Sequence, residues 1–462
     1  MRVASSYRHY HEMAVALLCI FAPAGVWSSQ GNDACHEPPT VIKSVRVFDG
    51  ETVIPEAHVI IRCDRISQVV VDGEMPEHPE DSIVLNGDGM TLMPGLFESH
   101  GHTYQRAMLE RSLDFGVTTV IDMGSASPDF VKKIDSEDEQ RQATDRADLF
   151  SAVLWVTAPG SHGTQFGEVP TLTDPDDAAA FVAQRIDDGA DFIKLIYDNF
   201  KMVDQQVPTL SKETMFAVVE AAHAQGKMAV VHSRDIDAYA DATEAGADGL
   251  VHAPVDAVPG PQLIARIKQQ GMYVGPNLSG LRPIGNSLTE DPFIGPMLTE
   301  SERESLLNFF PRHREGGEKI AEDSVTALHD AGVTILAGSD SPGPGTTVGA
   351  SMYLELERLV AVGLSPVDAL RAATSNPASM FGFQDRGRVS EGMFADLLLI
   401  DGRPDEDIRE IRRVHTIWKA GVAHPGPAAV SKASILSPAS HDQTASVLSA
   451  QASCVVALAE CR

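Results

Sequence analysis

The stretch Thr91-Leu-Met-Pro-Gly-Leu-Phe-Glu-Ser-His-Gly-His102 is an apolar run that ends in two histidines with one residue between them. In an extended segment, side chains at alternate positions point the same way. His100 and His102 can therefore reach one metal ion from the end of a single strand. Such a pair often arises by chance, so its meaning depends on whether further ligand residues end later strands.

Later apolar runs also carry residues with metal-ligand chemistry. They place a lysine inside the run 191–197, histidines at the ends of 228–232 and 249–252, and an aspartate at the end of 334–340: Lys194, His232, His252 and Asp340. Neutral imidazole and carboxylate suit zinc and similar divalent ions. A lysine ammonium repels a cation, whereas a lysine carbamate would bridge two. With a carboxylated Lys194, the six residues form the ligand inventory of a binuclear site.

Each candidate also has an ordinary structural explanation when it is taken alone. The chain has 16 histidines, and a single histidine is more often a surface or core residue than a ligand. Lys194 could extend its aliphatic stem out of a strand, and Asp340 could cap a helix before Pro342. The joint pattern favours a metal site, because every member belongs to a strand-like run and the runs follow in one order.

The order of the runs predicts the architecture. Eight apolar segments follow one another at 91–102, 117–122, 149–156, 191–197, 228–232, 249–252, 272–277 and 333–337. Amphipathic helices are expected at 176–188, 212–225, 236–245, 262–270 and 319–331, and four of them stop at Gly226, Gly246, Gly271 and Gly332. Alternating strands and helices indicate a parallel sheet, and eight units predict an α/β fold with a closed (β/α)8 TIM barrel. Such barrels place their chemistry at the C-terminal strand ends, where all six candidates fall.

On these residues the chain resembles the amidohydrolase superfamily, in its imidazolonepropionase-like and metal-dependent dipeptidase-like branch. The matching motifs are 93–102, Lys194, His232, His252, 338–340, 369–377 and 391–400, and the resemblance covers roughly residues 40 to 424. It implies that His100, His102 and Asp340 bind the more buried metal. It also implies that His232 and His252 bind a second metal and that Lys194, as a carbamate, bridges the two. Some relatives keep one metal only. Zinc is the default from ligand type, although manganese, iron or cobalt could occupy the site.

The resemblance also implies how the chain is divided. Short strands at 40–48, 57–62 and 66–71 would join others at 395–400 and 414–419 in one small β-sandwich beside the barrel. The predicted divisions are 1–29 for a signal peptide, 39–92 for the first part of the sandwich, 93–382 for the barrel, 383–424 for the second part and 425–462 for an Ala- and Ser-rich tail.

The two ends of the chain bear on its location. Arg2 and Arg8 precede an apolar core at 13–22, followed by small residues, which is typical of a secretory signal. The core is too short for a stable membrane span, so a secreted or periplasmic location is expected. Outside the signal, four cysteines permit two disulfides. The simplest pairing is Cys35 with Cys63 and Cys454 with Cys461, but the sequence does not decide it.

The charge of the chain restricts its partners. With 36 Lys and Arg against 65 Asp and Glu, the formal charge is −29, which argues against nucleic acid, whose backbone requires basic patches. A small-molecule amide substrate is the expected partner, and a homo-oligomer is compatible with the sequence.

The predicted site indicates a hydrolytic mechanism. Two divalent ions would lower the pKa of a shared water and polarise a carbonyl. Asp340 could accept the proton of that water and pass it to the departing amine. The expected reaction is cleavage of a C–N bond in an N-acyl amino acid, a dipeptide or a cyclic amide, with Asp340 as general acid and base.

Substrate contacts are less strongly indicated. His162 and Gln165 lie in the loop after the third strand, Tyr197 lies three residues beyond Lys194, and Arg234 follows His232 as a candidate carboxylate anchor. A structural loop or a surface salt bridge explains these residues about as well.

Two other classes of function stay open. A deaminase of the same superfamily often uses one metal and a glutamate three residues after the strand-five histidine, where this chain has Asp235. A non-catalytic binding protein with a residual metal site is the second alternative. The intact ligand set argues against it, because a decayed site should have lost some member.

Overall fold

The computed structural model describes residues 37–125, 127–140, 143–201, 206–283, 287–309 and 313–436. The signal peptide expected at 1–29 and most of the expected tail lie outside these residues. Cys63 is disulfide-bonded. The other cysteines lie outside the described residues, so both expected disulfide pairings stay predictions.

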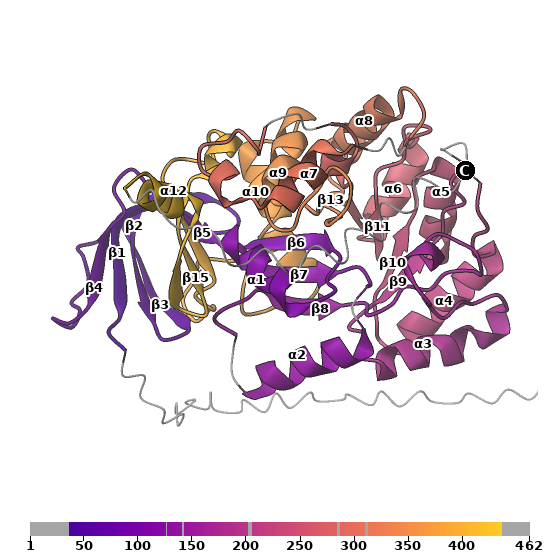
Figure 1. Cartoon of the computed structure of the whole chain (residues 1–462), viewed down its shortest axis with the longest axis horizontal. Coiled ribbons are helices and arrows are strands. Elements are labelled where there is room, and N and C mark those ends of the chain that lie inside the picture. Colours follow the sequence, from indigo (N-terminus) through magenta and orange to yellow (C-terminus); the bar gives the residue numbers. More distant parts are fainter. Residues whose placement is uncertain are drawn as a thin grey trace, which may run out of the picture. The chain divides into compact units, whose positions relative to one another are not determined.

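Eight parallel strands form the part of the fold that carries the candidate ligands (Figure 1). One sheet contains β6 (Leu96–Gly101), β7 (Val117–Asp122) and β8 (Asp148–Ser151), and the other contains β9 (Ile193–Ile196), β10 (Ala229–His232), β11 (Gly249–Val251), β12 (Tyr273–Gly275) and β13 (Thr334–Ile335). Neighbours within each sheet are consecutive along the chain. Single parallel bridges, Val156 with Leu195 and Gly101 with Ser341, link the two sheets on both sides. The order is that of a TIM-barrel-like fold, although the strand pairs make two sheets and not one continuous closed sheet.

Helices alternate with these strands, as the amphipathic patterns predict. The expected helices are present as α3 (Ala178–Asp187), α4 (Lys212–Ala224), α5 (Ile236–Ala245), α6 (Pro261–Gln269) and α8 (Gly317–Asp330). The glycines that follow four of them have φ angles of 68°, 82°, 69° and 78°, a left-handed conformation that ends helices and suits glycine. Further helices in the described residues are α1 (Arg106–Asp114), α2 (Pro128–Gln140), α7 (Glu300–Leu307), α9 (Ser351–Ala361), α10 (Pro366–Ala372) and α11 (Ser375–Met380).

Strand periodicity places two candidate ligands above the inner core. Phe192 and Val230 belong to an inner apolar cluster with residues such as Phe97, Tyr273 and Phe381. Because side chains alternate along a strand, Lys194 and His232 face the same side as Phe192 and Val230, two positions further toward the C-terminal end. The strands therefore carry both residues to the end of the interior where chemistry is expected.

The stretch that ends in the two histidines is divided between two sheets. β5 (Thr91–Pro94) pairs with β14 (Leu397–Ile400) and with β1 (Thr40–Phe48), whereas β6 pairs with β7. Gly95 separates β5 from β6, and a Cβ atom there would collide with Thr118. The apolar run 91–102 is therefore divided near the predicted boundary between residues 92 and 93, and the first strand of the parallel set begins at Leu96.

The strands before and after the parallel set combine in one mixed sheet of eight strands. Its order is β16 (Val422–Pro425), β15 (Val414–Lys419), β14, β5, β1, β2 (Val53–Arg62) and β3 (Arg65–Val71), with β4 (Ile83–Asn86) paired to β1. This sheet occupies the place of the expected β-sandwich, and its strands come from both expected parts. Buried ion pairs connect it to β8: Lys419 Nζ lies 3.0 Å from Asp396 Oδ2 and 3.0 Å from Asp148 Oδ2, and Arg386 also pairs with Asp148.

The first part of the expected tail is helical. Residues Pro427–Leu436 form α12, and Ser431 Oγ donates a hydrogen bond to Phe293 O at 3.2 Å. Proline at the first helical position and alanines after it explain why this part of the Ala- and Ser-rich tail forms a helix. Among the described residues, no helix combines the length and the apolar character needed to span a membrane.

Candidate metal centre

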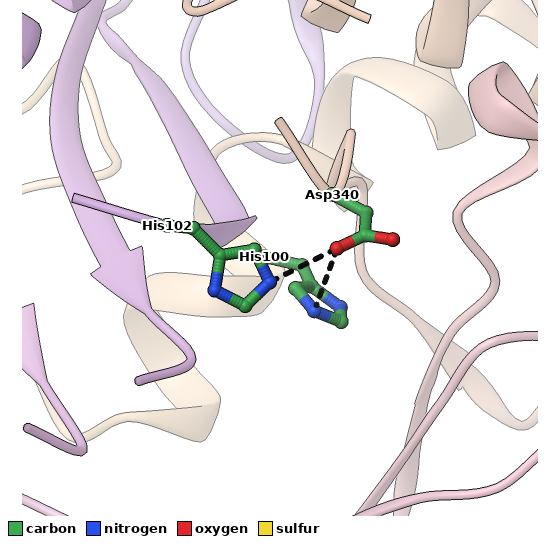
Figure 2. Close-up of side chains that lie close together, drawn as sticks. All are labelled: His100, His102 and Asp340. Carbon is green, nitrogen blue, oxygen red and sulfur yellow. Dashed lines mark hydrogen bonds and ion pairs between the residues drawn. The ribbon is translucent and has the colours of Figure 1, made fainter. Parts of the chain in front are cut away.

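Three ligand atoms converge where β6 ends and in the turn that follows β13 (Figure 2). His102 Nε2 lies 3.0 Å and His100 Nε2 lies 3.5 Å from Asp340 Oδ1. The three ligand atoms lie within 4.8 Å of one another. His100 is buried, whereas His102 and Asp340 are half-buried, so the group is open on one side.

The backbone holds Asp340 directly against the histidine strand. Asp340 N donates a hydrogen bond to His100 O at 2.8 Å, and His102 N donates to Ser341 O at 2.8 Å. A Cβ atom at Gly338 would lie 2.7 Å from His100 N, so only glycine allows this approach. Asp340 itself has φ 55°, a conformation that aspartate tolerates better than most residues. The turn 338–340 thus fixes the carboxylate beside both imidazoles.

Hydrogen bonds orient the two imidazoles so that both Nε2 atoms face Asp340. His100 Nδ1 lies 3.0 Å from Asn277 Oδ1, and His102 Nδ1 lies 2.7 Å from Gly124 O. Asn277 Nδ2 donates to Gly338 O at 2.7 Å, which fixes the amide with its oxygen toward His100. Both partners of the Nδ1 atoms are acceptors, so each Nδ1 carries a proton, and Nε2 is the atom of each ring that can bind a metal.

A buried carboxyl group ties the same two segments together. Glu98 Oε1 accepts hydrogen bonds from His100 N at 3.1 Å and from Ser339 N at 2.8 Å, and Glu98 Oε2 accepts one from Ser339 Oγ. Burial raises the pKa of Glu98 to about 8. Glu98 therefore positions the backbone on both sides of the metal-ligand group.

The other predicted ligands lie beside this group but outside the compact set. The His252 ring centroid is 5.0 Å from that of His100 and 4.3 Å from that of His232. His232 Nε2 faces Asp198 Oδ2 at 3.3 Å. Lys194 is buried and lies within electrostatic range of Asp340. The structure thus brings all six candidates to one end of the strand set, while only His100, His102 and Asp340 converge closely among the described residues.

Burial lowers the pKa of most basic groups in this cluster, but at His102 the hydrogen bond and charge of Asp340 outweigh burial and raise the pKa. Burial lowers the pKa of Lys194 to about 7 against the opposing charges of Asp340 and Asp122. Burial, with the charge of Lys194, holds the pKa of His100 well below the usual histidine value. Burial also lowers the pKa of His232 to about 4 in spite of its hydrogen bond with Asp198. Imidazoles with low pKa values are neutral at pH 7 and can donate a lone pair to a metal.

Three of the four predicted substrate residues lie near the cluster. His162 has its ring centroid 5.2 Å from that of His232. Arg234 Nε donates to Asp198 Oδ2 at 2.6 Å, and its guanidinium lies 4.3 Å from the ring centroid of Phe200. Gln165 is exposed and bonds to His162.

Tyr197 does not join this group. Its hydroxyl donates to Asp241 Oδ2 of α5 at 3.0 Å, and its ring packs against the outer core. The reason is strand parity, because Tyr197 lies three positions beyond Lys194, and an odd offset turns its side chain to the opposite face, toward the helices.

Successive ring contacts connect the cluster with the loop after β8. Trp155 contacts His102 and Phe166 at centroid distances of 6.3 and 6.2 Å, and Phe166 contacts His162 at 5.7 Å. With the contacts among the other histidines, seven rings form a closed circuit. Phe166 is 54% exposed, so this side of the circuit presents an aromatic surface to solvent.

Sequence reasoning missed several residues that position the site. Asp122 is fully buried and accepts hydrogen bonds from Thr103 N at 2.8 Å and from Ser151 Oγ at 2.5 Å. Glu98, Asn277 and Asp198 were missed as well. A usable signal existed for Asp122 and Asn277, because both end apolar runs in the same way as the predicted ligands. Glu98 carried a signal as well, because it is a charged residue inside an apolar run, as Lys194 is.

Comparison with known proteins gives matches that span most of the chain. The sequence profile of the amidohydrolase family matches residues 91–423. An uncharacterized protein of Mycobacterium tuberculosis is 24% identical over 347 residues, which are 71% of this chain and 84% of that protein. An imidazolonepropionase of Deinococcus deserti is 33% identical over 98 residues, which are 20% of this chain and 24% of that enzyme.

A solved structure shows the same fold. The crystal structure of a Xaa-Pro dipeptidase with methionine bound in its active site superposes with a TM-score of 0.67 and 23% sequence identity. The superposition covers 84% of this chain and 100% of the dipeptidase. The fold with its eight parallel strands is therefore one that is known from experimental structures.

Proposed function

The chain belongs to the amidohydrolase family and is a hydrolase of carbon–nitrogen bonds, and we propose that its substrate is a small amide: an N-acyl amino acid, a dipeptide or a cyclic amide. The convergence of His100, His102 and Asp340 carries this proposal. The likeness to a dipeptidase and to an imidazolonepropionase supports a small substrate and an amide-type bond.

The donor set fits a divalent cation. Two imidazole nitrogens with lone pairs and one carboxylate oxygen face one another within 4.8 Å, and the Nδ1 atoms are held by carbonyl oxygens as in known metal sites. His100, His102 and Asp340 would hold the ion, for which zinc is the default. When bound, such an ion lowers the pKa of a water molecule and polarises a carbonyl group.

The proposal includes a second ion held by His232 and His252. Lys194, as a carbamate, would bridge the two ions. The support is that Lys194 lies within range of Asp340 and that its pKa of about 7 leaves a large neutral fraction at pH 7. The neutral amine is the form that adds carbon dioxide. A free ammonium at this position would instead repel the cations.

Asp340 moves the proton in this proposal. One of its carboxylate oxygens faces both Nε2 atoms, and the other points away from them (Figure 2). The outward oxygen can accept a proton from the attacking water and return it to the departing amine. The half-buried position of Asp340 lets substrate reach that oxygen.

Two surfaces beside the cluster would bind the substrate. Arg234 and His162 offer N–H donors to oxygen atoms of the substrate on the Asp198 side. Trp155 and the exposed ring of Phe166 offer an aromatic surface to its apolar part. This arrangement supports a substrate with a polar end and an apolar end.

The deaminase alternative has weaker support. Asp235, at the position of the deaminase glutamate, caps α5 by accepting hydrogen bonds from Asp237 N at 3.1 Å and Ala238 N at 3.0 Å. It also pairs with Lys201 at 2.7 Å. A carboxylate with these partners serves the helix start and is not aimed at the cluster.

Metal analysis tests the site and a substrate panel tests the reaction. Wild type should hold two metals per chain, and Lys194→Ala should hold one or none; the exposed Lys132→Ala serves as control. Unchanged stoichiometry in Lys194→Ala would remove the bridge from the proposal. Formation of a new amino group should be detected when an acyl-amino acid, a dipeptide or a cyclic amide is cleaved. Ammonia release from an amino-heterocycle, with no amide cleaved, would favour the deaminase.

A further inference from the structure

The loop after β8 contains a polar chain that ends on His162. Gln165 Oε1 accepts a hydrogen bond from Gly163 N at 2.8 Å, and Gln165 Nε2 lies 2.8 Å from His162 Nδ1. Gln165 itself is exposed. Its side chain is therefore occupied at both ends by the loop to which it belongs.

These two contacts determine the tautomer of His162. A backbone N–H can only donate, so the amide atom facing Gly163 is the oxygen, and the atom facing His162 is the nitrogen. An amide nitrogen can only donate, so His162 Nδ1 must accept. A neutral imidazole that accepts at Nδ1 carries its proton on Nε2. An imidazolium would carry protons on both nitrogens, so a ring that accepts a hydrogen bond at Nδ1 is neutral.

The loop is held firmly enough to keep this ring in place. Thr157 Oγ1 donates to His162 O at 2.8 Å, and Thr164 Oγ1 donates to Ser161 O at 2.7 Å. The His162 ring lies between Phe200, at 4.7 Å, and Phe166, at 5.7 Å. Among the described residues, no side chain or carbonyl pairs with His162 Nε2. The ring centroid of His162 is 5.2 Å from that of His232, so the ring belongs to the cluster and carries an N–H donor that has no acceptor among the described residues.

We infer that Gln165 is a positioning residue and not a substrate ligand: it fixes neutral His162 as the Nε2–H tautomer, so that the site presents an N–H donor to an oxygen atom of the substrate. The substrate class is thereby restricted to molecules with an acceptor oxygen at this position. The identity of the reaction rests on the proposed function, whereas the tautomer does not.

Reversal of the tautomer is the sharpest test of this inference. In Gln165→Glu the new carboxylate has only acceptors, so the ring must place its proton on Nδ1, and Nε2 then offers a lone pair to the substrate oxygen. In Gln165→Met a side chain of similar length makes neither hydrogen bond and leaves the ring unbiased. Glu168→Gln, at an exposed position of the same loop, is the control.

Nitrogen NMR of the metal-loaded full-length enzyme with ¹⁵N-labelled histidine reports the tautomer directly, and the His162→Gln variant identifies the signals. Wild type and Glu168→Gln should show a protonated Nε2 and an unprotonated Nδ1 at His162, and Gln165→Glu should show a protonated Nδ1. A protonated Nδ1 in wild type would overturn the inference, whatever reaction the enzyme catalyses.

Kinetics separates this role from a structural one. For the best substrate of the amide panel, kcat/KM should fall roughly 10- to 100-fold in Gln165→Glu, less in Gln165→Met and not at all in Glu168→Gln. Metal content should equal that of wild type in all three. Equal losses in Gln165→Glu and Gln165→Met, with the tautomer unchanged, would overturn the inference. If no amide is cleaved, the proposed function fails, and the NMR result still decides the tautomer.

Discussion

Asp340 has two roles at the scale of the single residue, because one of its oxygens faces the imidazoles and the other faces away. In Asp340→Asn the amide oxygen can still face the histidines. The amide NH2 group replaces the outward oxygen and cannot accept a proton. Turnover should therefore fall about 10²- to 10⁴-fold, and substrate binding should change much less. Steady-state kinetics measures turnover and equilibrium titration measures substrate binding. Asp330→Asn, at an exposed position, is the control. Near-normal turnover would remove Asp340 from the role of base.

Asn277 acts on the metal through His100. Asn277→Ala removes the acceptor at His100 Nδ1 and the donor to Gly338 O, and should weaken zinc binding about 10- to 100-fold. Asn277→Asp keeps an acceptor for His100 Nδ1, so its zinc affinity should fall less than that of Asn277→Ala. Competition with a chelator measures both affinities. Equal zinc affinity in Asn277→Ala and wild type would show that the amide does not orient the imidazole.

Residues that alternate along one strand could be predicted, and residues that depend on partners distant in sequence could not. His100, His102, Lys194 and His232 follow from apolar runs and strand parity. The same parity rule, applied to Tyr197, would have placed it outside the site. Glu98 and Asp198 escaped prediction because their roles depend on hydrogen bonds to Ser339 and Arg234, and no local pattern indicates such partners.

At the scale of the element, the loop after β8 provides a matched pair of glycines. Gly163 has φ 98° and a Cβ atom there would collide with the Trp155 indole, whereas Gly167 has φ 154° and open space around the same position. Gly163→Ala should displace the loop and lower kcat/KM by about 10²-fold, with metal content unchanged. Gly167→Ala adds only the cost of a side chain at a positive φ angle, and its kcat/KM should fall much less. Similar kinetics for the two variants would contradict the role of the Trp155 contact.

Elements with local signals were predictable. Helices α4, α5, α6 and α8 end at glycines that the sequence displays, and their predicted bounds agree with the structure to within about two residues. Helix α7 was missed although Thr299 and Glu302 form a capping box, because few apolar positions follow it. The predicted boundary at 92/93 lies inside β5 and not at Gly95, because β5 owes its place to β14, a strand from the far end of the chain.

At the scale of the whole molecule, a buried charge network joins the eight-stranded sheet to β8. Burial alone would raise the pKa of Asp148, but Lys419 and Arg386 outweigh it and lower that pKa. A carboxyl group with a lowered pKa in the folded state stabilises the fold above the unfolded-state value of about 3.9. That stabilisation is lost as the pH falls below this value toward the folded-state pKa.

The acid stability of the molecule should therefore depend on Asp148. Between pH 5 and pH 3 the melting temperature of wild type should fall more steeply than that of Asp148→Asn, which cannot titrate at this position. Differential scanning fluorimetry over this range measures both slopes. Parallel slopes would show that Asp148 contributes no acid-dependent stability.

The junction at Gly95 joins the first strand of the parallel set to a strand, β5, whose neighbour β14 is synthesised late. β5 passes directly into β6, yet one edge of β5 is filled only by β14, which the ribosome releases after all the parallel strands. A nascent or prematurely terminated chain leaves that edge bare, and a bare edge readily pairs with other polypeptides. Incomplete copies of this enzyme should therefore be recognised and removed as insoluble or protease-sensitive products, whereas a complete copy covers the edge as soon as its last strands emerge.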